Sequence, residues 1–348
     1  MVLKMDGCVK SNIKLQPQTR FLLIRTDKIG DLLLTTPAIQ VLKTRYPNSF
    51  IAFLCGSYAA AVLENNPWVD LIIKYDDKNS SFFETVSKIK KLKFDVAIHF
   101  YIEWQSTWIT RFAKIPLRIG PKSKPASVLL NFPIMQKRSC VEKHEAEYNL
   151  DLVKICDAFD FIPPSTPQIF LQETEITRGK QMLTEILKNQ NKKPIFIHPG
   201  SKGSAQNWPL TSFLELAKKF ADQGLDVIVT GGKDEEELLK TVEKCNLPHL
   251  YRCPSNLTLR EFAALIHEGE LMISNSTGPL HMASALGVST LSFYPHLPIT
   301  TSAKRWGPYP PSSRHTILTP KIQNDPLSSI SVKEAFRITK EILAGGNL

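Results

Sequence analysis

Residues 273–286, ISNSTGPLHMASAL, gather the groups that a phosphate-binding turn needs. Small hydroxyl and amide residues at 274–278 stand between an apolar run typical of a buried strand and an apolar run typical of a helix. Pro279 lies where the first turn of a helix tolerates proline. A helix start presents unpaired N–H groups and the positive end of the helix dipole, so a phosphate or diphosphate is the expected ligand. The alternative is an ordinary helix with Ser276 or Thr277 as its cap.

A second polar turn, residues 25–31 (RTDKIGD), follows the apolar run at residues 21–24. Asp31 comes directly after Gly30, at the expected mouth of the first helix. Its carboxylate could act as a general base that accepts a proton from an attacking hydroxyl. The alternative is a carboxylate that only stabilises the helix N-terminus. That position also lowers the pKa of a carboxyl group, which would weaken it as a base.

Two glycine-containing turns offer further ligand contacts. Residues 198–204, HPGSKGS, would let the backbone approach a phosphate, with Lys202 supplying positive charge. Gly231 and Gly232 follow the next predicted strand and suggest a close approach to a nucleoside. A plain loop is an equal alternative at both places. The turn 25–31 has one glycine rather than GxGxxG, and the turn 198–204 does not match GxxxxGK(S/T), so we expect no dinucleotide site and no P-loop.

Two more features could take part in binding. His281 falls in the first turn of the helix that follows residues 274–278 and could donate to a phosphate oxygen, with a structural role as the alternative. Residues 305–309, RWGPY, form a rigid aromatic and basic segment that either walls a ligand cleft or closes a domain.

The chain of 348 residues carries a formal net charge of +10, and most of the excess lies early. Residues 1–170 hold 23 Lys and Arg against 16 Asp and Glu, and the remainder holds 20 against 17. Basic clusters fall at Lys88, Lys90, Lys91 and Lys93, and at Arg118, Lys122 and Lys124. An anionic membrane surface or an acidic substrate would suit this charge, as would an ordinary solvated surface. No nucleic-acid-binding motif accompanies it, so nucleic acid is not an expected partner.

Composition indicates a globular chain, with 43% hydrophobic residues. The chain contains no run of about 18 apolar residues, so we expect no transmembrane helix. Residues 1–20 are polar and dotted with lysine, which indicates a loose leader rather than a secretory signal and hence a cytoplasmic protein. The six cysteines form no CxxC pair and no zinc-type cluster, so we expect free thiols and no metal site.

Strand and helix patterns alternate along the chain. A strand at 21–24, a helix reaching about residue 46 and a strand at 50–54 make a β-α-β unit with parallel strands. Further predicted strands lie at 71–74, 95–100, 195–198, 225–230, 249–252, 271–274 and 288–293. Further predicted helices lie at 141–160, 175–188, 211–223, 234–245, 259–267, 280–286 and 332–343. This alternation predicts an α/β fold with doubly wound parallel sheets.

The proline-rich segment 163–167, PPSTP, indicates a break between two domains. We therefore expect a leader at 1–20, a Rossmann-like domain at 21–168, a linker region with a helix at 169–193, a second Rossmann-like domain at 194–325 and a terminal helix at 326–348. Ligands of open α/β sheets bind at the carboxyl ends of the strands. Two such domains would enclose a cleft, across which the turns 25–31 and 274–278 could face each other.

Four motifs, in order, resemble those of one enzyme family. These are IRTDKIGDLLLTTPAIQVLKTRYP at 24–47, HPGSKGSAQNWP at 198–209, SNSTGPLHMASALGV at 274–288 and RWGPY at 305–309. They are similar to motifs of the ADP-heptose:lipopolysaccharide heptosyltransferases, glycosyltransferase family nine. The resemblance implies a GT-B architecture, with an acceptor-binding first domain, an ADP-sugar-binding second domain and a terminal helix that packs back on the first domain.

The resemblance also implies an inverting transfer of heptose from ADP-heptose to the inner core of lipopolysaccharide, without an obligatory metal or other cofactor. Asp31 matches the catalytic base. The implied donor-binding residues are His198, Gly200, Ser201, Lys202, Gln206, Gly231, Gly232, Asn275, Ser276, Thr277, Gly278, Pro279, Leu280 and His281. The implied acceptor-binding residues, for an anionic lipid A–Kdo core, are Lys28, Gly30, Arg118 and Lys122. Such an enzyme would work in peripheral contact with the cytoplasmic face of the inner membrane.

Two residues depart from the family pattern. Gln206 stands where many members have a lysine that faces the donor, and Ser276 where many have an aspartate that touches the donor sugar. Lys202 is the candidate to replace the missing charge. These differences leave open another nucleotide sugar, a nucleotide-sugar epimerase of the same fold, or a non-catalytic sugar-nucleotide-binding protein. The sequence does not predict an oligomeric state.

Overall fold

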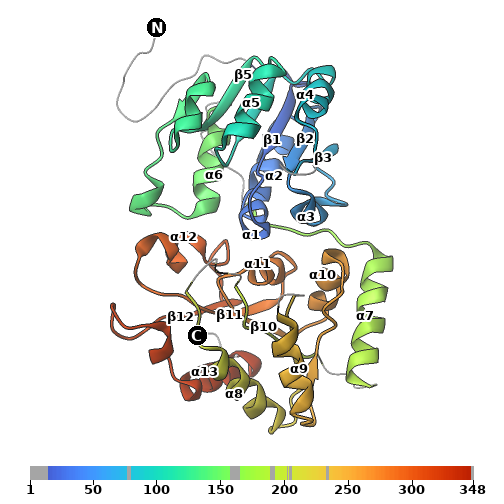
Figure 1. Ribbon diagram of the computed structural model, residues 1–348, viewed down its shortest axis with the longest axis vertical. Coiled ribbons are helices and arrows are strands. Elements are labelled where there is room, and N and C mark those ends of the chain that lie inside the picture. The colour runs from blue at the N-terminus through green and yellow to red at the C-terminus, as the bar shows by residue number, and fades with distance from the viewer. Residues whose placement is uncertain are drawn as a thin grey trace. The chain divides into compact units, whose positions relative to one another are not determined.

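A computed structural model describes residues 15–76, 80–156, 165–188, 193–201, 203, 206–232 and 235–345 (Figure 1). The chain divides into two compact units. Unit 1 comprises Met1–Arg138 and Glu145–Gln168, and unit 2 comprises Ser139–His144 and Ile169–Leu348. Each unit is built around its own parallel six-stranded sheet.

Unit 1 has the strand order β3-β2-β1-β4-β5-β6. Its strands are β1 (Arg20–Ile24), β2 (Phe50–Cys55), β3 (Leu71–Lys74), β4 (Val96–His99), β5 (Leu117–Pro121) and β6 (Phe132–Ile134). Its helices are α1 (Ile29–Leu33), α2 (Thr36–Arg45), α3 (Ser57–Ala60), α4 (Phe82–Lys91), α5 (Trp104–Phe112) and α6 (Glu145–Lys154). In the middle of this sheet, Leu22 of β1 lies beside Ala52 of β2 on one side and beside Ala97 of β4 on the other.

Alternation along β1 distributes its side chains to two helical layers. Leu22 and Ile24 pack in a cluster with Ile89 of α4 and Ile109 of α5. Phe21 points to the other face, where its ring centroid lies 5.6 Å from that of Tyr46. Helices therefore cover both faces of the sheet, and the strands are apolar on both sides, as a buried parallel sheet requires.

The single helix expected up to about residue 46 is two helices, α1 and α2. The break falls before Pro37, whose ring nitrogen carries no hydrogen and cannot donate to the carbonyl of Leu33. The hydroxyl of Thr36 donates to that carbonyl instead, at 2.8 Å. Because α1 ends here, Asp31 lies on a short helix of its own.

Unit 2 has the strand order β12-β11-β10-β7-β8-β9. Its strands are β7 (Ile195–His198), β8 (Val227–Val229), β9 (Leu250–Arg252), β10 (Leu271–Asn275), β11 (Ser289–Phe293) and β12 (His315–Leu318). Its helices are α7 (Glu173–Leu187), α8 (Leu210–Ala221), α9 (Glu236–Lys244), α10 (Leu259–His267), α11 (Gly278–Ala285), α12 (Ala303–Trp306) and α13 (Val332–Leu343).

Helix α7, which falls in the expected linker region 169–193, packs on α10. Gly179 makes the close approach of these helices possible, since a Cβ there would lie 2.4 Å from the carbonyl oxygen of Ala264. Met182 and Leu187 of α7 join the buried cluster of Phe196 on the sheet.

The terminal helix α13, which was expected to pack back on the first domain, contributes residues to the core of unit 2. Ala335 and Ile338 of α13 are buried in the core of unit 2. Phe336 stacks on Phe220 of α8, with ring centroids 4.9 Å apart. The apolar face of α13 is therefore already covered by α8 of unit 2.

The order of strands reverses once in each sheet. In unit 1 the reversal lies between β1 and β4, and in unit 2 between β7 and β10. Loops diverge at such a switch point and leave a crevice beyond the carboxyl ends of the two strands. Among the described residues, no helix is long and apolar enough to cross a membrane. The α/β fold with two Rossmann-like units is as predicted.

Candidate active site

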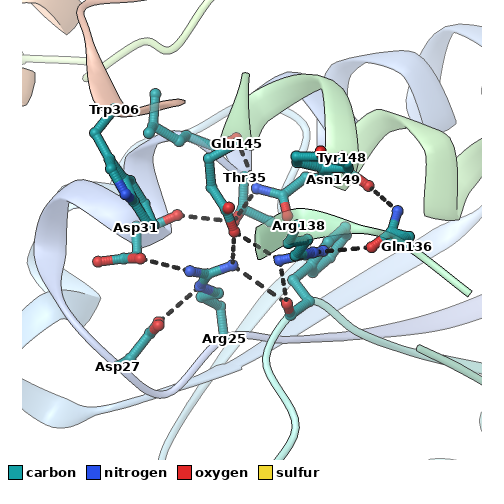
Figure 2. Close-up of polar contacts among 12 residues, drawn as sticks. Arg25, Asp27, Asp31, Thr35, Gln136, Arg138, Glu145, Tyr148, Asn149 and Trp306 are labelled. Atoms are coloured by element: carbon teal, nitrogen blue, oxygen red, sulfur yellow. Dashed lines mark hydrogen bonds and ion pairs between the residues drawn. The ribbon is translucent and has the colours of Figure 1, made fainter. Parts of the chain in front are cut away.

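The switch point of unit 1 is organised by the guanidinium of Arg25, which directly follows β1. Its side chain is only 2% exposed and donates to three carboxylates (Figure 2). Nε donates to Asp27 at 2.7 Å, Nη2 to Asp31 at 2.6 Å and Nη1 to Glu145 at 3.2 Å. Nη1 also donates to the carbonyl of Phe100 after β4, at 3.2 Å. Arg25 therefore ties together the turns that leave the two strands of the switch point.

A second guanidinium completes the cluster. Nη1 of Arg138 donates to the same Oε1 of Glu145 at 2.6 Å, and Nε donates to Gln136 at 2.9 Å. Glu145 is 1% exposed and thus holds its charge between two arginines. The cluster combines three carboxyl groups with two permanently charged guanidinium groups, so full ionisation leaves one excess negative charge. One carboxyl group is consequently harder to ionise than the others.

Asp31 is that carboxyl group. Burial raises its pKa to about 6, which outweighs the opposing effect of Arg25, and the charges of Asp27 and Glu145 add to the increase. The expected lowering of the pKa by the helix start does not prevail, because α1 has only five residues and burial of the carboxyl group dominates. The Asp31 side chain is still 17% exposed, so a substrate can reach it. A reachable carboxylate with this pKa suits general-base chemistry near neutral pH.

Of the predicted acceptor-binding residues, Lys28 and Lys122 are exposed and Gly30 is buried in α1. Arg118 makes structural contacts within unit 1. Its side chain points inward from β5, where it is 9% exposed and donates to the carbonyl groups of Ile115, at 2.6 Å, and Leu129, at 3.1 Å. It holds the chain around β5 together through Nε and Nη1.

Sequence reasoning missed Lys124 as a site residue, although it named the basic cluster. Its Nζ lies 3.8 Å from the ring centroid of Tyr101, which follows β4. Thr26 donates to the carboxylate of Glu103, the N-cap of α5. These contacts place aromatic, hydroxyl and basic groups around the carboxyl ends of β1 and β4.

The switch point of unit 2 is organised by a neutral amide, that of Asn275 at the end of β10. Asn275 is fully buried. Its Oδ1 accepts from the backbone N–H of Trp208 at 2.9 Å, and its Nδ2 donates to the carbonyl of Pro199 at 2.8 Å. Both polar atoms of the side chain thus join the turns after β7 and β10, so Asn275 positions these turns, and its predicted donor-binding role stays a prediction.

Thr277 is the N-cap of α11, as one of the two sequence alternatives predicted. Its Oγ1 accepts from the N–H of Leu280 at 3.4 Å and contacts Ser274 Oγ at 2.8 Å. Pro279 stands in the first turn, where its missing N–H costs nothing. The turn 274–278 thus continues directly into the N-terminus of a helix of eight residues, and Ser276 and Gly278 within it are half-buried.

Glu235 is a second residue that sequence reasoning missed. Its Oε2 accepts from the N–H of Gly232 at 2.7 Å, and its own N–H donates to the carbonyl of Gly232 at 2.9 Å. A Cβ on Gly200 would lie 1.4 Å from Glu235 Oε1, so a larger residue there would displace the Glu235 carboxylate. A carboxylate therefore stands between the turns after β7 and β8. The signal was the spacing GGxxE that begins at Gly231.

The remaining predicted donor-binding residues lie around these turns. His198 Nδ1 contacts Thr230 Oγ1 at 2.9 Å, Ser201 is buried, and Gln206 is exposed with Nε2 3.5 Å from the carbonyl of Leu297. Burial lowers the pKa of His281 to about 3, so its ring is neutral. Lys202 lies outside the described residues.

The RWGPY segment at 305–309 receives the segment Ser139–His144 within unit 2. His144 Nε2 contacts the carbonyl of Gly307 at 2.9 Å, and the His144 ring stacks on Tyr309 with centroids 4.9 Å apart. Tyr294 donates to the carbonyl of Trp306 at 2.6 Å. The segment therefore has a structural role in unit 2 through its backbone carbonyls.

Comparison with known proteins now decides the family. Residues 83–330 match the family model described as glycosyltransferase family 9 (heptosyltransferase). The chain belongs to glycosyltransferase family 9. A Haemophilus influenzae protein provisionally named a glycosyltransferase is 33% identical over 311 residues, which cover 86% of this chain and 89% of that protein. The family resemblance inferred from the four motifs is confirmed.

Solved structures show the same fold. A family 9 glycosyltransferase from Veillonella parvula superposes with a TM-score of 0.84 at 19% identity, covering 97% of this chain and 100% of that chain. The ADP-heptose lipopolysaccharide heptosyltransferase II of Escherichia coli superposes with a TM-score of 0.78 at 20% identity, covering 94% and 99%. Both are GT-B folds of two Rossmann-like domains. Family membership makes this protein a glycosyltransferase and disfavours the epimerase and the non-catalytic binding protein.

Proposed function

We propose that this family 9 enzyme transfers a heptose from ADP-heptose to the inner core of lipopolysaccharide, with inversion and with Asp31 as general base. The observation that carries the proposal is the carboxyl group of Asp31, which is reachable by solvent, has a raised pKa and lies at the switch point of unit 1. The name of the E. coli structural relative, which specifies an ADP-heptose donor and lipopolysaccharide, supports the choice of substrates.

In the proposed reaction an acceptor hydroxyl oxygen bonds to the anomeric carbon of the donor while the bond from that carbon to the diphosphate oxygen breaks. The hydroxyl proton goes to Asp31, and the bonding electrons leave with ADP. The transition state resembles an oxocarbenium ion, as in glycoside chemistry generally. Arg25 holds the Asp31 carboxylate through Oδ1, which fixes its orientation before the acceptor arrives.

Unit 2 would supply the donor site. The N-terminus of α11, with the N–H of Gly278, would receive the diphosphate, whose charge grows as ADP leaves. Neutral His281 would donate to an oxygen of the same group. Glu235 would accept hydrogen bonds from the ribose hydroxyls, the usual task of a carboxylate beside a nucleotide in such sheets. Gln206 and Ser276 would face the sugar and its phosphate, and they would set the choice of donor.

Unit 1 would supply the acceptor site. Lys28 and Lys122 are exposed, and Lys124 lies over Tyr101 beside the carboxyl end of β4. These cations would pair with the phosphate and carboxylate groups of a lipid A–Kdo core. An acceptor of this kind places the enzyme at the cytoplasmic face of the inner membrane.

A panel of nucleotide sugars, tested with lipopolysaccharide from a core-truncated host, examines the proposal. ADP-heptose should give ADP release that depends on the acceptor, with at least tenfold preference over UDP- and GDP-sugars. Release from a different donor with the same acceptor would retain the glycosyltransferase and replace the donor. An Asp31→Ala variant that keeps the full transfer rate would remove the base from the mechanism.

A further inference from the structure

The solvent side of α4 and α5 in unit 1 carries large aromatic side chains. Trp104, Trp108 and Phe112 follow at four-residue spacing along α5 and are 51%, 38% and 54% exposed. Phe83 at the start of α4 is 81% exposed. Residues four apart lie on one face of a helix, so the α5 side chains form a stripe. We call Phe83, Trp104, Trp108 and Phe112 the aromatic patch.

The aromatic patch is continuous across both helices, which pack side by side (Figure 1). The ring of half-buried Phe82 lies 5.4 Å from that of Phe83 and 6.1 Å from that of Phe112, and Trp108 stacks on Phe112 at 5.2 Å. The opposite sides of the helices fill the core with Ile89 and Ile109. Other residues therefore fill the core, and the exposed rings leave apolar surface in contact with water.

Positive charge surrounds the aromatic patch. Residues 82–93 contain four lysines and one glutamate, and residues 104–114 contain two basic residues and no acid. The exposed basic side chains are Lys88, Lys90, Lys91, Lys93, Arg111 and Lys114. Lys90 follows Phe83 by seven residues, two helical turns, and therefore lies on the same face of α4.

We propose that this aromatic and basic face docks the enzyme on the surface of a bilayer that contains anionic lipid. Tryptophan and phenylalanine place apolar rings at the level of the headgroups, and flanking lysines and arginines bind anionic headgroups. A protein partner fits less well, because the centres of protein interfaces are depleted in lysine. The role of this docking rests on the proposed function, because docking would hold the enzyme at the surface where a lipid-linked acceptor lies.

Vesicle flotation with the full-length chain tests the proposal. The vesicles contain phosphatidylcholine alone or with one third phosphatidylglycerol. The wild type should float with the anionic vesicles at low salt, and added salt should release it. Trp108→Ser with Phe112→Ser should lower the bound fraction about tenfold, and Lys90→Glu with Lys91→Glu should do so by a similar factor.

Matched controls carry the same changes elsewhere. Ile322→Ser removes an apolar side chain that is 64% exposed in unit 2, and Lys218→Glu reverses a charge on the exposed side of α8. Neither control should change flotation. Equal flotation of the patch variants and the wild type would overturn the proposal. So would equal binding to both vesicle types, or a dimer that the patch substitutions dissociate without any effect on vesicles.

A transfer assay with a deacylated, water-soluble acceptor separates this proposal from the proposed function. The patch variants should keep the wild-type rate on that acceptor and lose rate on acylated acceptor in vesicles. If no sugar nucleotide turns over with any acceptor, the proposed function fails while the flotation result stands. If the deacylated acceptor reacts and flotation is unaffected by the patch, docking fails alone.

Discussion

The two switch points of this protein lie at equivalent places in similar sheets and hold opposite kinds of group. In unit 1 a buried arginine, Arg25, gathers Asp27, Asp31 and Glu145. In unit 2 a buried amide, Asn275, joins two backbone turns, and the helix that follows is capped by Thr277. Carboxylates held against one another gain proton affinity, whereas hydroxyl groups and free N–H groups bind an anion without repelling it. The fold provides the crevice, and the side chains decide whether it holds a base or an anion.

The largest expected effect follows from removing the base. Asp31→Asn should lower kcat by roughly 10²–10⁴-fold, because the amide cannot accept the acceptor proton. Steady-state kinetics with saturating donor and acceptor measure it. Asp27→Asn is the matched control, since Asp27 pairs with the same Arg25 and is 18% exposed, close to the 17% of Asp31. If the two variants lose activity equally, the arginine cluster matters only as a structural unit.

Removal of the Asn275 amide in unit 2 has the next largest expected effect, which is a loss of stability. Asn275→Ala leaves the N–H of Trp208 and the carbonyl of Pro199 buried without these partners, which should cost about 2–4 kcal/mol of unfolding free energy. Chemical denaturation measures this cost. A loss below about 0.5 kcal/mol would show that the two turns hold their positions without Asn275.

Substitutions of Arg118 and Lys122 distinguish a cation with a structural role from a cation that binds substrate in unit 1. Arg118→Met should lower the unfolding free energy by about 1–3 kcal/mol, because two carbonyl groups lose their donor. The KM for acceptor should stay within twofold of the wild type. Lys122→Met should show the reverse, with an increased KM and unchanged stability. An increased KM in the Arg118 variant alone would restore its predicted acceptor-binding role.

The cap of α11 gives the smallest effect. Thr277→Val removes the acceptor of the Leu280 N–H and should cost about 1 kcal/mol of stability. The KM for the donor should rise several-fold, and the KM for the acceptor should not change. Product-inhibition measurements with ADP check the same site, since the inhibition constant should rise in parallel. Unchanged donor and ADP binding would mean that the start of α11 is not the anion site.

The sequence predicts the elements of unit 2 well because its apolar runs are short and clearly bounded. The observed β7, α10 and α13 have the bounds that the pattern predicts. Residues 101–124, for which no strand or helix was predicted, contain α5 and β5, and their mixed aromatic and basic residues obscure the alternation. The inward orientation of Arg118 could not be predicted, because the strand that carries it had not been assigned. The strands β6 and β12 were also missed, and both lie at sheet edges.

The sequence located both turns of the site but not the contacts that shape them. Arg25 and Glu145 are 120 positions apart, and Trp208 and Asn275 are 67 apart, so no local pattern links them. The pKa of Asp31 was expected to fall because only the helix start was visible. Burial in the folded chain raises it, and one of the carboxyl groups that add to the increase, that of Glu145, lies far away in the sequence.

The stability of the folded protein should also depend on the pKa of Asp31, and it can be measured without any assay of activity. A carboxyl group whose pKa is raised on folding stabilises the protein below its unfolded pKa, and that stabilisation is lost as the pH rises through the folded pKa. For Asp31 this window runs from about 4 to about 6. The melting temperature of Asp31→Asn relative to the wild type should therefore increase across this window and then level off.

The pH dependence of kcat/KM reports the pKa of the base in the free enzyme and therefore shows whether Asp31 is that base. We expect a plateau near pH 7 and a tenfold loss of kcat/KM per pH unit below about 6, with the same change of slope in Asp27→Asn. A rate that stays constant down to pH 4.5 in folded enzyme would contradict it, since Asp31 would then be either an ordinary carboxylate or no base at all.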